Sequence, residues 1–538
     1  MNWPALASIA SSPSRTAPAS APTPRTLAVS PARAVALPLL FTAGLLACVL
    51  YAPVREQPRL LWSCLGSAAI LIAWTLALLA SALRTQRLFV LQVMLRPQHY
   101  VQACAHASIL LYWGWYWRPV YEFAPLIVAQ LCFAYALDAL ISYSRRGSYT
   151  LGFGPFPIIL STNLFLWFKH DWFYLQLLMI AVGFAAKEFI HWTKDGRQTH
   201  IFNPSSFTLT IFSLALIATG ASDLTWGQDI AITQFYPPHM YLFLFLIAMP
   251  GQLLFGVTTM TLSAVLTTYL WGLAYYGATG TYYFIDSYIP IAVFLGMHLL
   301  FTDPSTSPGT ELGRIIFGAL YGLTTIALYQ LLGQAGLPTF YDKLLQVPML
   351  NLTIRGIDRA VRSGVLRRFD PAQVGRSLPL RHRRLAYIAV WACVFALMST
   401  AQGVGDRHRG QFVPFWQQAC QQDRSYACRY LAQMQTNYCN AGAAWSCNEL
   451  GILQGERNGD RPGAIASIQR GCDLGFQPAC ANVTALAGDG ALVTGSPPLE
   501  DLAILLRGSK GPIADRTSAS LYTLACGQGW PDSCGRSQ

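Results

Sequence analysis

The chain has 538 residues, of which 53% are apolar and only 12% are charged, a combination that soluble globular proteins rarely show. The formal charge of +12 does not indicate a nucleic-acid partner, because the basic residues stand between apolar segments and form no basic face interleaved with aromatic rings. The aromatic fraction of 13% supplies rings that favour the interface between membrane and water. We therefore predict that most of the chain lies in a lipid bilayer.

The first 34 residues are rich in Ala, Pro and Ser and contain arginines but no acidic residue. Such a segment cannot build a core, so residues 1–34 are predicted to be a disordered cytoplasmic tail. The first apolar run begins near residue 36 and continues into a full membrane span. It therefore indicates a retained anchor rather than a cleaved signal peptide.

Apolar stretches of spanning length recur to about residue 333, and they predict an all-α fold with a polytopic transmembrane helix bundle over residues 35–335. Helices are required because lipid offers no partner for an unpaired backbone amide. One further span is expected at residues 385–401. The other expected spans lie near residues 36–53, 59–83, 102–117, 122–143, 152–169, 173–190, 205–220, 239–250, 252–277, 288–302 and 313–333.

The distribution of basic residues predicts the orientation of the chain. Basic pairs near residues 84–87, 145–146 and 194–197 fall on alternate loops, which places the N-terminus in the cytoplasm. Nine arginines lie between Arg355 and Arg384 against two acidic residues, so residues 336–384 are predicted to be a cytoplasmic linker. The span at 385–401 would then carry the C-terminal region out of the cytoplasm.

The span count conflicts with this orientation. Counting every expected span places residues 334–384 outside, whereas their arginines indicate the inside. One span is therefore miscounted or re-entrant, either within residues 239–277 or at the amphipathic stretch 341–352. We give the arginines more weight than the count.

Eight cysteines near the C-terminus recur at one spacing. Each pair is eight residues apart and stands in a short loop between two helical patterns, so a disulfide in each pair would clamp two helices at a tight corner. Metal sites are the competing interpretation, but zinc favours clustered Cys and His at shorter separations, and no His follows His408. Disulfides are therefore favoured for Cys420 and Cys428, Cys439 and Cys447, Cys472 and Cys480, and Cys526 and Cys534.

The wording around these cysteines, such as "YCNAGAAWSCNEL" and "GCDLGFQPACANV", resembles the disulfide-bridged helical repeats of the sel-one-like class, relatives of tetratricopeptide repeats. The resemblance covers about residues 415–536 and implies a short α-solenoid over residues 415–538. Because disulfides persist in oxidising compartments, this domain is expected in the periplasm of a bacterial inner-membrane protein. Solenoids usually present a concave surface, so a membrane or periplasmic protein partner is expected.

Two polar segments interrupt the membrane domain. The first, "KEFIHWTKDGRQTHIFNPSSF", places ionisable groups at a helix end and a turn at Asn203-Pro204, with Ser205 and Ser206 able to cap the next helix. An anionic ligand such as a flavin phosphate would suit it, and the alternative is a basic cytoplasmic loop with a capped helix. The candidate residues are Lys187, His191, Arg197, His200, Asn203 and Ser205.

The second polar segment, "FTDPSTSPGTELGRIIFGALYGL", has two proline-fixed turns and several hydroxyl groups. Asp303 could cap a turn, or it could accept a hydrogen bond from a donor on a bound ring. The alternative is an ordered turn between two spans. Its candidate residues are Asp303, Thr306 and Arg314.

Together the phrases "FNP" at 202–204 and "TDPSTSP" at 302–308, with the glycine-spaced helix after them, resemble the D subunit of the Rnf electron-transport complex and the B subunit of the sodium-pumping NADH:quinone reductase. The resemblance covers about residues 120–335. It implies a membrane subunit that carries flavin mononucleotide or riboflavin and passes electrons in a complex coupled to ion movement. The family's Ser-Gly-Ala-Thr attachment phrase is absent, so noncovalent binding is expected.

The leading hypothesis is a membrane electron-transfer subunit whose repeat domain docks a partner protein. Two alternatives stay open: a non-catalytic scaffold whose repeats assemble partners, and a transporter for an ion or small molecule, suggested by ionisable groups at helix ends. No metal site is expected.

Overall fold

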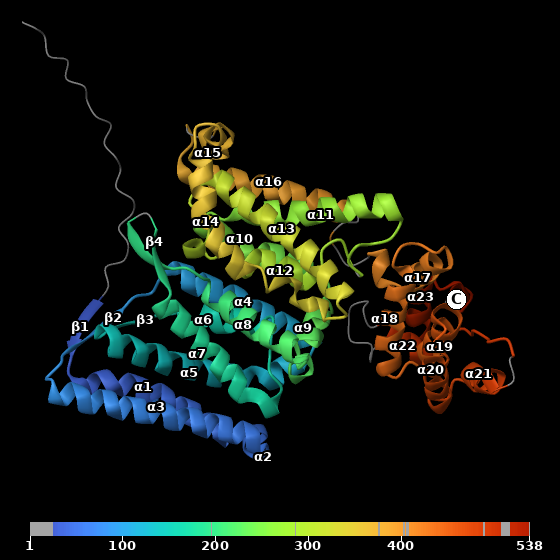
Figure 1. Cartoon of the computed structure of the whole chain (residues 1–538), viewed down its shortest axis with the longest axis horizontal. Coiled ribbons are helices and arrows are strands. Elements are labelled where there is room, and N and C mark those ends of the chain that lie inside the picture. The colour runs from blue at the N-terminus through green and yellow to red at the C-terminus, as the bar shows by residue number, and fades with distance from the viewer. Residues whose placement is uncertain are drawn as a thin grey trace, which may run out of the picture.

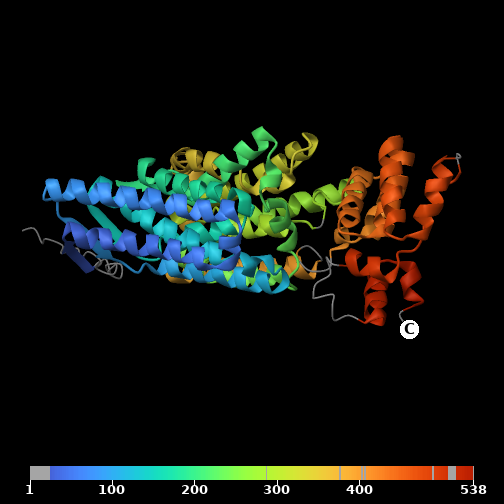
Figure 2. The same cartoon turned by 90° about the horizontal axis from the view of Figure 1, so that it is seen from below.

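The computed structural model describes residues 25–194, 196–285, 287–374, 377–401, 404, 408–487, 490–506 and 517–536. These residues are overwhelmingly helical and form two parts (Figure 1). Residues 25–401 make a bundle of long helices. Residues 408–536 make a smaller helical unit, the disulfide domain, which lies at one end of the bundle in both views (Figures 1 and 2).

The bundle consists of helices that run side by side along one axis (Figure 1). Its main helices are α1 (Pro31–Ala47), α3 (Pro58–Arg84), α4 (Pro97–Tyr116), α5 (Pro119–Arg146), α6 (Pro155–Asn163), α7 (Phe173–Phe189), α8 (Pro204–Thr219), α10 (Met240–Phe255), α11 (Thr258–Thr279), α12 (Ile291–Leu299), α13 (Glu311–Gln334), α14 (Val347–Val361) and α16 (Leu380–Thr400). Short helices α2 (Ala52–Glu56), α9 (Gly227–Thr233) and α15 (Pro371–Val374) join them.

Six helical segments are long and apolar enough to cross a membrane, by length and composition. The all-α prediction, with membrane-length helices followed by a disulfide-bridged helical region, is therefore confirmed. The segments are Pro31–Leu50, Pro58–Arg84, Pro119–Arg146, His170–Phe189, Glu311–Gln334 and Leu380–Thr400.

Two small sheets lie at the end of the bundle opposite the disulfide domain, which we call the sheet end (Figure 1). In the first, β1 (Arg25–Val29) runs antiparallel to β2 (Phe89–Val93), which runs parallel to β3 (Ser148–Leu151). In the second, β4 (His191–Lys194) and β5 (Arg197–His200) form an antiparallel pair. The tail prediction was therefore wrong for residues 25–34, which pair in a sheet and begin α1, while residues 1–24 lie outside the described residues.

Two bundle helices stop after nine residues, where the chain continues without regular helix. Helix α6 ends at Asn163, and the following residues 164–168 are almost fully buried. Helix α12 ends at Leu299, and residues 300–302 are buried in the same way. Non-helical backbone at such depth is tolerated only where protein groups satisfy it, so these two breaks are the places where polar side chains are needed.

The breaks belong to an internal repeat. Helices α4 to α8 and α10 to α14 follow the same order, with the short broken helix third in each set. The packing pairs correspond: α4 with α6 and α10 with α12, α5 with α7 and α11 with α13, α7 with α8 and α13 with α14. The sets run in opposite directions, because Tyr112 near the end of α4 donates a hydrogen bond to the Pro238 carbonyl just before α10. This is an inverted repeat of the kind found in transporter folds.

Close helix packing in the second set depends on small residues in α13. A Cβ at Gly318 would lie 2.1 Å from the Met260 carbonyl oxygen of α11, and one at Gly322 would lie 2.9 Å from the Ala264 carbonyl oxygen. The backbones approach each other as closely as small residues allow, which is how helices associate where lipid removes the hydrophobic drive.

The segment after α13 packs against the bundle. Tyr341 donates a hydrogen bond to Ser222, beyond the end of α8, and Asp358 accepts one from the Gly309 amide, just before α13. Residues 341–358 therefore run back along the whole of α13 as one more pass through the bundle. The predicted linker over 336–384 differs from the structure in this first part, because residues 341–358, which include most of the suspected stretch 341–352, pack against α13.

The other suspected region, residues 239–277, contains two ordinary helices. Pro250 lies inside α10, and the chain turns at Gly256, which has φ 68°. The expected boundary between spans at residues 250–252 was therefore misplaced by about a turn and a half of helix.

The disulfide domain stacks helix against following helix. Its helices are α17 (Val413–Gln421), α18 (Ala427–Asn440), α19 (Ala444–Asn458), α20 (Arg461–Asp473), α21 (Gln477–Ala487), α22 (Leu499–Leu505), α23 (Ser518–Gly527) and α24 (Pro531–Cys534). Three of the four bridged corners turn at a glycine with positive φ, three residues after the first cysteine: Gly442, Gly475 and Gly529. The first corner has Asp423 at that place, with φ 50°.

Candidate functional site

The two polar segments, a hundred residues apart in the sequence, meet at the sheet end of the bundle. His200 at the end of β5 places its Nε2 3.1 Å from Oδ2 of Asp303, and both side chains are largely buried. Asp303 also caps the short turn Pro304–Thr306, accepting from the amide of Ser305 at 2.9 Å and from the hydroxyl of Thr306 at 3.2 Å. The predicted capping role of Asp303 is confirmed.

Asn203 joins the first segment to the second. Its Oδ1 accepts from the amides of Ser205 and Ser206, so Asn203 itself caps α8, where the two serines had been expected to do so. Its Nδ2 donates to the Leu300 carbonyl at 2.8 Å, directly after the end of α12. The side chain therefore ties the start of α8 to the break at α12.

Two residues of α14 lock the same loops from the other side. Oδ1 of Asn351 accepts from the Asn203 amide, and its Nδ2 donates to the Thr306 carbonyl at 3.0 Å. Asp358 accepts from the amides of Gly309 and Thr310. The sequence analysis missed both residues, because α14 was assigned to a linker; the only available signal was that polar residues recur on the buried face of an amphipathic helix.

Arg314 serves the second segment from the first turn of α13. Its guanidinium donates to the carbonyls of Pro308 and Gly256 and to Oε1 of Glu311 at 2.7 Å. Oε2 of Glu311 in turn accepts from the hydroxyl of Thr259 at 2.9 Å. This network holds the starts of α11 and α13 together at the sheet end.

The remaining candidates of the first segment lie beside this loop pair. Lys187 pairs with Asp138 of α5 at 3.6 Å, and Glu188 pairs with Arg145 and Arg146 at the end of α5. His191 stands opposite His200 in the β4–β5 pair. The backbone of Arg197 belongs to β5, but its side chain lies outside what the structure describes.

The contacts of Asp303 set its charge. Burial alone would raise the pKa of this carboxyl, but the hydrogen bond and charge of His200, with the Ser305 amide and the Thr306 hydroxyl, outweigh burial and hold the pKa below its usual value. Asp303 is therefore an anion at neutral pH, stabilised by contacts with His200, the Ser305 amide and the Thr306 hydroxyl.

The nominated flavin contacts are thus occupied by protein. His200, Asn203, Ser205, Asp303, Thr306 and Arg314 each have protein hydrogen-bond partners within the loop pair. As arranged, they build and lock the two loops rather than surround an open ring-sized space. The groups therefore do not fit a flavin held inside the loop pair.

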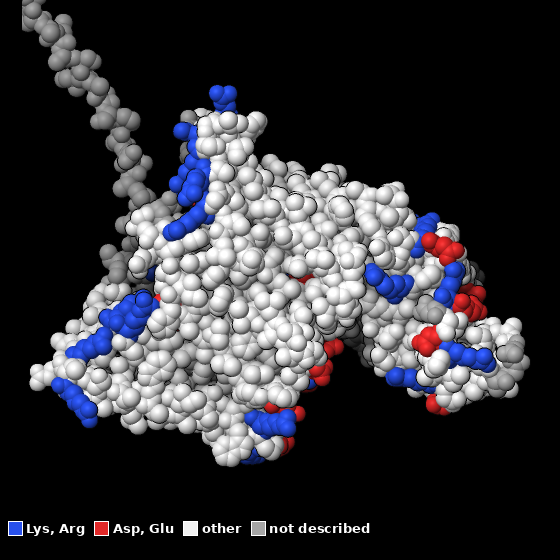
Figure 3. Space-filling model, in the orientation of Figure 1, with Lys and Arg blue, Asp and Glu red and all other residues white. Residues whose placement is uncertain are grey.

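Basic side chains gather at this end of the bundle. On the face shown in Figure 3, lysines and arginines cluster at the sheet end and over α14 and α15, whereas acidic side chains lie toward the other end and on the disulfide domain. The two acidic residues within the nine-arginine segment both accept hydrogen bonds from backbone amides. Asp358 accepts from Gly309, and Asp370 accepts from Ala372. The arginines there consequently leave a net positive surface.

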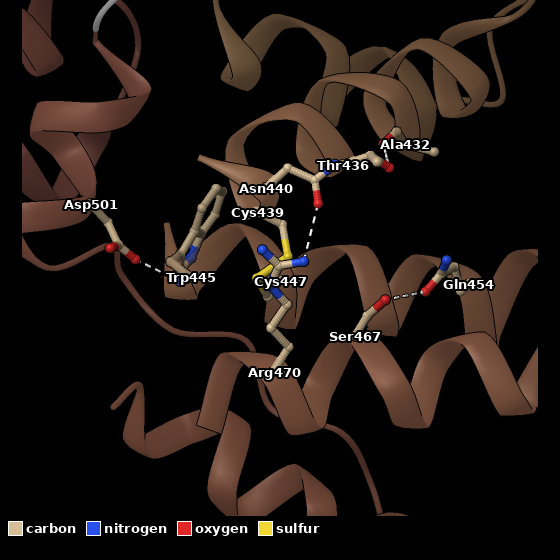
Figure 4. Close-up of a disulfide and its surroundings, with 10 residues drawn as sticks. All are labelled: Ala432, Thr436, Cys439, Asn440, Trp445, Cys447, Gln454, Ser467, Arg470 and Asp501. Atoms are coloured by element: carbon tan, nitrogen blue, oxygen red, sulfur yellow. Dashed lines mark hydrogen bonds between the residues drawn. A yellow bond between two sulfur atoms is a disulfide. The ribbon is translucent and has the colours of Figure 1, made fainter. Parts of the chain in front are cut away.

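The four predicted cysteine pairs are all disulfides. The bridges join Cys420 to Cys428, Cys439 to Cys447, Cys472 to Cys480 and Cys526 to Cys534, with Cα–Cα distances of 4.6–4.7 Å. Each links the end of one helix to the start of the next, as Figure 4 shows for Cys439 and Cys447. The metal interpretation of these cysteines was therefore wrong. The other five cysteines are free.

Hydrogen bonds beside the Cys439–Cys447 bridge hold successive helices together (Figure 4). Arg470 of α20 donates to Asn440 at 3.1 Å, and Ser467 of α20 donates to Gln454 of α19 at 2.7 Å. The backbone amide of Trp445 donates to Asp501 of α22, which ties the last helices to the first ones. Hydrogen bonds between helices therefore stabilise the stack together with the disulfides.

The disulfide domain is seated directly on the loop between α11 and α12. Arg424 donates to the Gly280 carbonyl at 2.8 Å, Thr281 donates to the Ser425 carbonyl at 3.1 Å, and Tyr430 donates to the Tyr283 carbonyl at 2.8 Å. These contacts, which we call the seam, come from the first bridged corner. They fix the domain to the bundle independently of its covalent link through α16.

Comparison with known proteins gave no match to any family model, curated protein or solved structure.

Proposed function

We propose that this protein is a membrane-embedded subunit of an electron-transfer complex, assembled on its disulfide domain. The observation that carries the proposal is the meeting of the two phrases that resemble the Rnf D subunit. His200 contacts Asp303, and Asn203 reaches the Leu300 carbonyl, although the phrases are about a hundred residues apart. The two sequence segments that resemble a redox family therefore lie together as one compact structural element.

The proposal includes a noncovalent flavin, as the resemblance implies. The loop pair would support it from beneath, with the basic residues of the sheet end facing the flavin phosphate. Lys187, Arg145 and Arg146 lie there beside Glu188. This arrangement assigns the loop residues a supporting role and leaves electron donor and acceptor to other subunits.

For orientation, we propose that the sheet end faces the cytoplasm and the disulfide domain faces the periplasm. The gathering of basic residues at one end supports this direction, since short cytoplasmic loops carry an excess of Lys and Arg. The four disulfides support it independently, because they persist in an oxidising compartment. A bacterial inner membrane satisfies both conditions.

A second candidate function, transport of an ion or small molecule, is favoured by a different observation. The inverted repeat brings two broken helices into the bundle, and transporters place their binding sites at such breaks. The scaffold alternative rests on the disulfide domain alone and needs neither feature.

The visible spectrum of the protein purified in mild detergent separates these functions. The redox proposal expects flavin absorbance that is released into solution by acid, with Asn203→Ala and Asp303→Ala lowering the flavin content per protein. Cys393→Ala, a change at a free cysteine on α16, is the matched control and should keep the wild-type content. A folded but colourless preparation, expressed with riboflavin in the medium, would contradict the redox proposal and leave transport or scaffolding.

Partner docking is tested separately by crosslinking at the disulfide domain. Exposed positions on α20 and directly after it, Ile465 and Leu474, can carry a photoreactive residue. The docking proposal expects a discrete crosslinked band in the native membrane that a membrane-side position such as Leu83 does not give. Identical patterns from both sites would contradict it.

A further inference from the structure

The exposed side of α14 changes character along the helix. Near its start the exposed side chains are apolar, Met349 and Leu352, whereas further along Arg355, Arg359 and the C-cap residue Arg362 are exposed. The buried side lies within the bundle, where α14 packs against α13 and α8. A helix whose exposed side passes from apolar to basic is suited to lead from the hydrocarbon of a membrane into the headgroup region.

The end of α14 lies at the level where membrane-length helices begin. Asp358 accepts from the Gly309 amide just before α13. Arg384, near the start of α16, donates to the carbonyls of Leu253 and Leu254 near the end of α10. Both α13 and α16 are long and apolar enough to cross a membrane. The segment that joins α14 to α16 therefore lies at a membrane surface, at the sheet end of the bundle.

Several exposed arginines at this surface are not used within the fold. Neighbouring arginines are: Arg314 pairs with Glu311, and Arg355 donates to the Thr193 carbonyl. Four exposed guanidinium groups, in contrast, have no hydrogen bond or ion pair with any described residue. They belong to Arg359, Arg367, Arg368 and Arg381. These four cations are therefore available to an anionic partner.

Large apolar side chains are exposed beside these arginines. Val365 and Phe369, on either side of Arg367 and Arg368, are 73% and 69% exposed, and Leu380 at the start of α16 is exposed as well. Exposed apolar side chains that gather in one place mark a contact surface. Their combination with arginines is typical of segments that lie in a membrane interface, where apolar side chains enter the acyl region and cationic ones stay with the headgroups.

We propose that this surface binds the headgroups of anionic phospholipids in the membrane that the bundle occupies. The four unpaired guanidinium groups contact lipid phosphates, and Val365 and Phe369 enter the acyl region beside them. A lipid fits this surface better than an acidic protein does, because the segment is continuous with the membrane-length helix α16 and its exposed apolar side chains adjoin the arginines. The inference depends neither on a flavin nor on the direction in which the chain crosses the membrane.

The test is the thermal stability of the full-length protein in a neutral detergent at fixed ionic strength, titrated with phosphatidylglycerol or with phosphatidylcholine of the same acyl chains. A ligand that binds only the folded state raises Tm in a saturable way. We expect phosphatidylglycerol to do so and phosphatidylcholine to act much more weakly. The same response to both lipids would overturn the proposal and leave the arginines to an acidic partner protein. An equal rise with inorganic phosphate alone would overturn the assignment to a lipid.

Paired substitutions locate the site. Arg367→Gln with Arg368→Gln should raise the phosphatidylglycerol concentration that gives half of the Tm shift at least about tenfold, because two cations near the lipid surface are lost. Arg55→Gln with Arg118→Gln removes two exposed arginines at the opposite end of the bundle and is the matched control, which should keep the wild-type response. Phe369→Ala should weaken the response less than the arginine pair does. Equal responses of the two double variants would place the lipid elsewhere and overturn the assignment.

Discussion

The bundle and the disulfide domain hold their helices together by different means. In the bundle, backbones touch at Gly318 and Gly322, and buried amides such as Gln130 and Asn163 bond across helices. In the disulfide domain, each helix pair is short and buries little, and a covalent bridge closes the corner. Helices in lipid gain no hydrophobic free energy by associating, so they depend on close van der Waals contact and hydrogen bonds. A small repeat in water buries too little surface to be stable alone, and a disulfide stabilises it by reducing the conformational entropy of the unfolded chain.

The largest effect should come from filling the helix contact in the bundle. Gly318→Ala puts a Cβ 2.1 Å from a backbone oxygen of α11, so the helices must separate, at a cost of about 3 kcal/mol or more. Gly333→Ala in the same helix meets only a methyl group at 3.9 Å and should be neutral or slightly stabilising. Thermal unfolding in detergent measures both variants. Equal Tm values would show that the close contact at Gly318 does not stabilise the bundle.

Removing a bridge should cost the disulfide domain somewhat less. Replacing Cys439 and Cys447 together by Ala frees a loop with a sequence separation of 8, which is expected to cost about 2–3 kcal/mol. Protease digestion of the full-length protein should then cut within residues 427–458 first. Cys393→Ala, which removes a free thiol, is the control, and digestion at the wild-type rate in the double variant would show that packing alone holds the corner.

Removing one of the three buried amides that meet at the end of α6 should cost about 1–3 kcal/mol. Gln130→Met removes the partner of both Asn163 and Gln176, so two buried amides lose hydrogen bonds while the volume stays similar. The Tm in detergent should fall by more than in Gly333→Ala, which leaves these amides in place. An unchanged Tm would show that the three amides contribute nothing measurable to the stability of the bundle.

The smallest effect is a pH dependence in the disulfide domain. Burial raises the pKa of Glu449 in α19 from 4.5 to about 7, and the nearby Glu456 adds to the shift against a hydrogen bond from Asn448. Because the folded state prefers the protonated acid, stability is highest below the unfolded pKa and falls as pH rises from about 4.5 to about 7. Glu449→Gln should therefore gain about 1–2 kcal/mol over wild type at pH 8 and nothing at pH 4.5. A gain that is the same at both pH values would contradict the buried-acid explanation.

Much of the fold could be predicted from the sequence, since its strongest signals are local. Apolar run length gave the long helices, and a repeated cysteine spacing gave the four bridges. The packing of residues 341–358 against α13 left only a weak signal in the sequence, because the stretch before α14 is irregular and α14 is an amphipathic helix with Arg355 exposed. Neither part is among the membrane-length apolar helices.

The candidate site was predicted in part. Asn203 and Asp303 were found because prolines follow them and mark turns. Their neighbours Asn351 and Asp358 were not found, since contact across 148 residues of sequence leaves no local pattern.

The seam has a consequence for how the protein is made. Thr281 bonds a residue 144 positions later in the chain, so its loop emerges from the ribosome well before the partner exists. The helices α11 and α12 on either side of that loop are therefore synthesised first, and the disulfide domain binds their loop last. A chain that stops before residue 409 leaves the Gly280 and Tyr283 carbonyls without their donors, which gives cellular proteolysis a way to distinguish an unfinished molecule from a complete one.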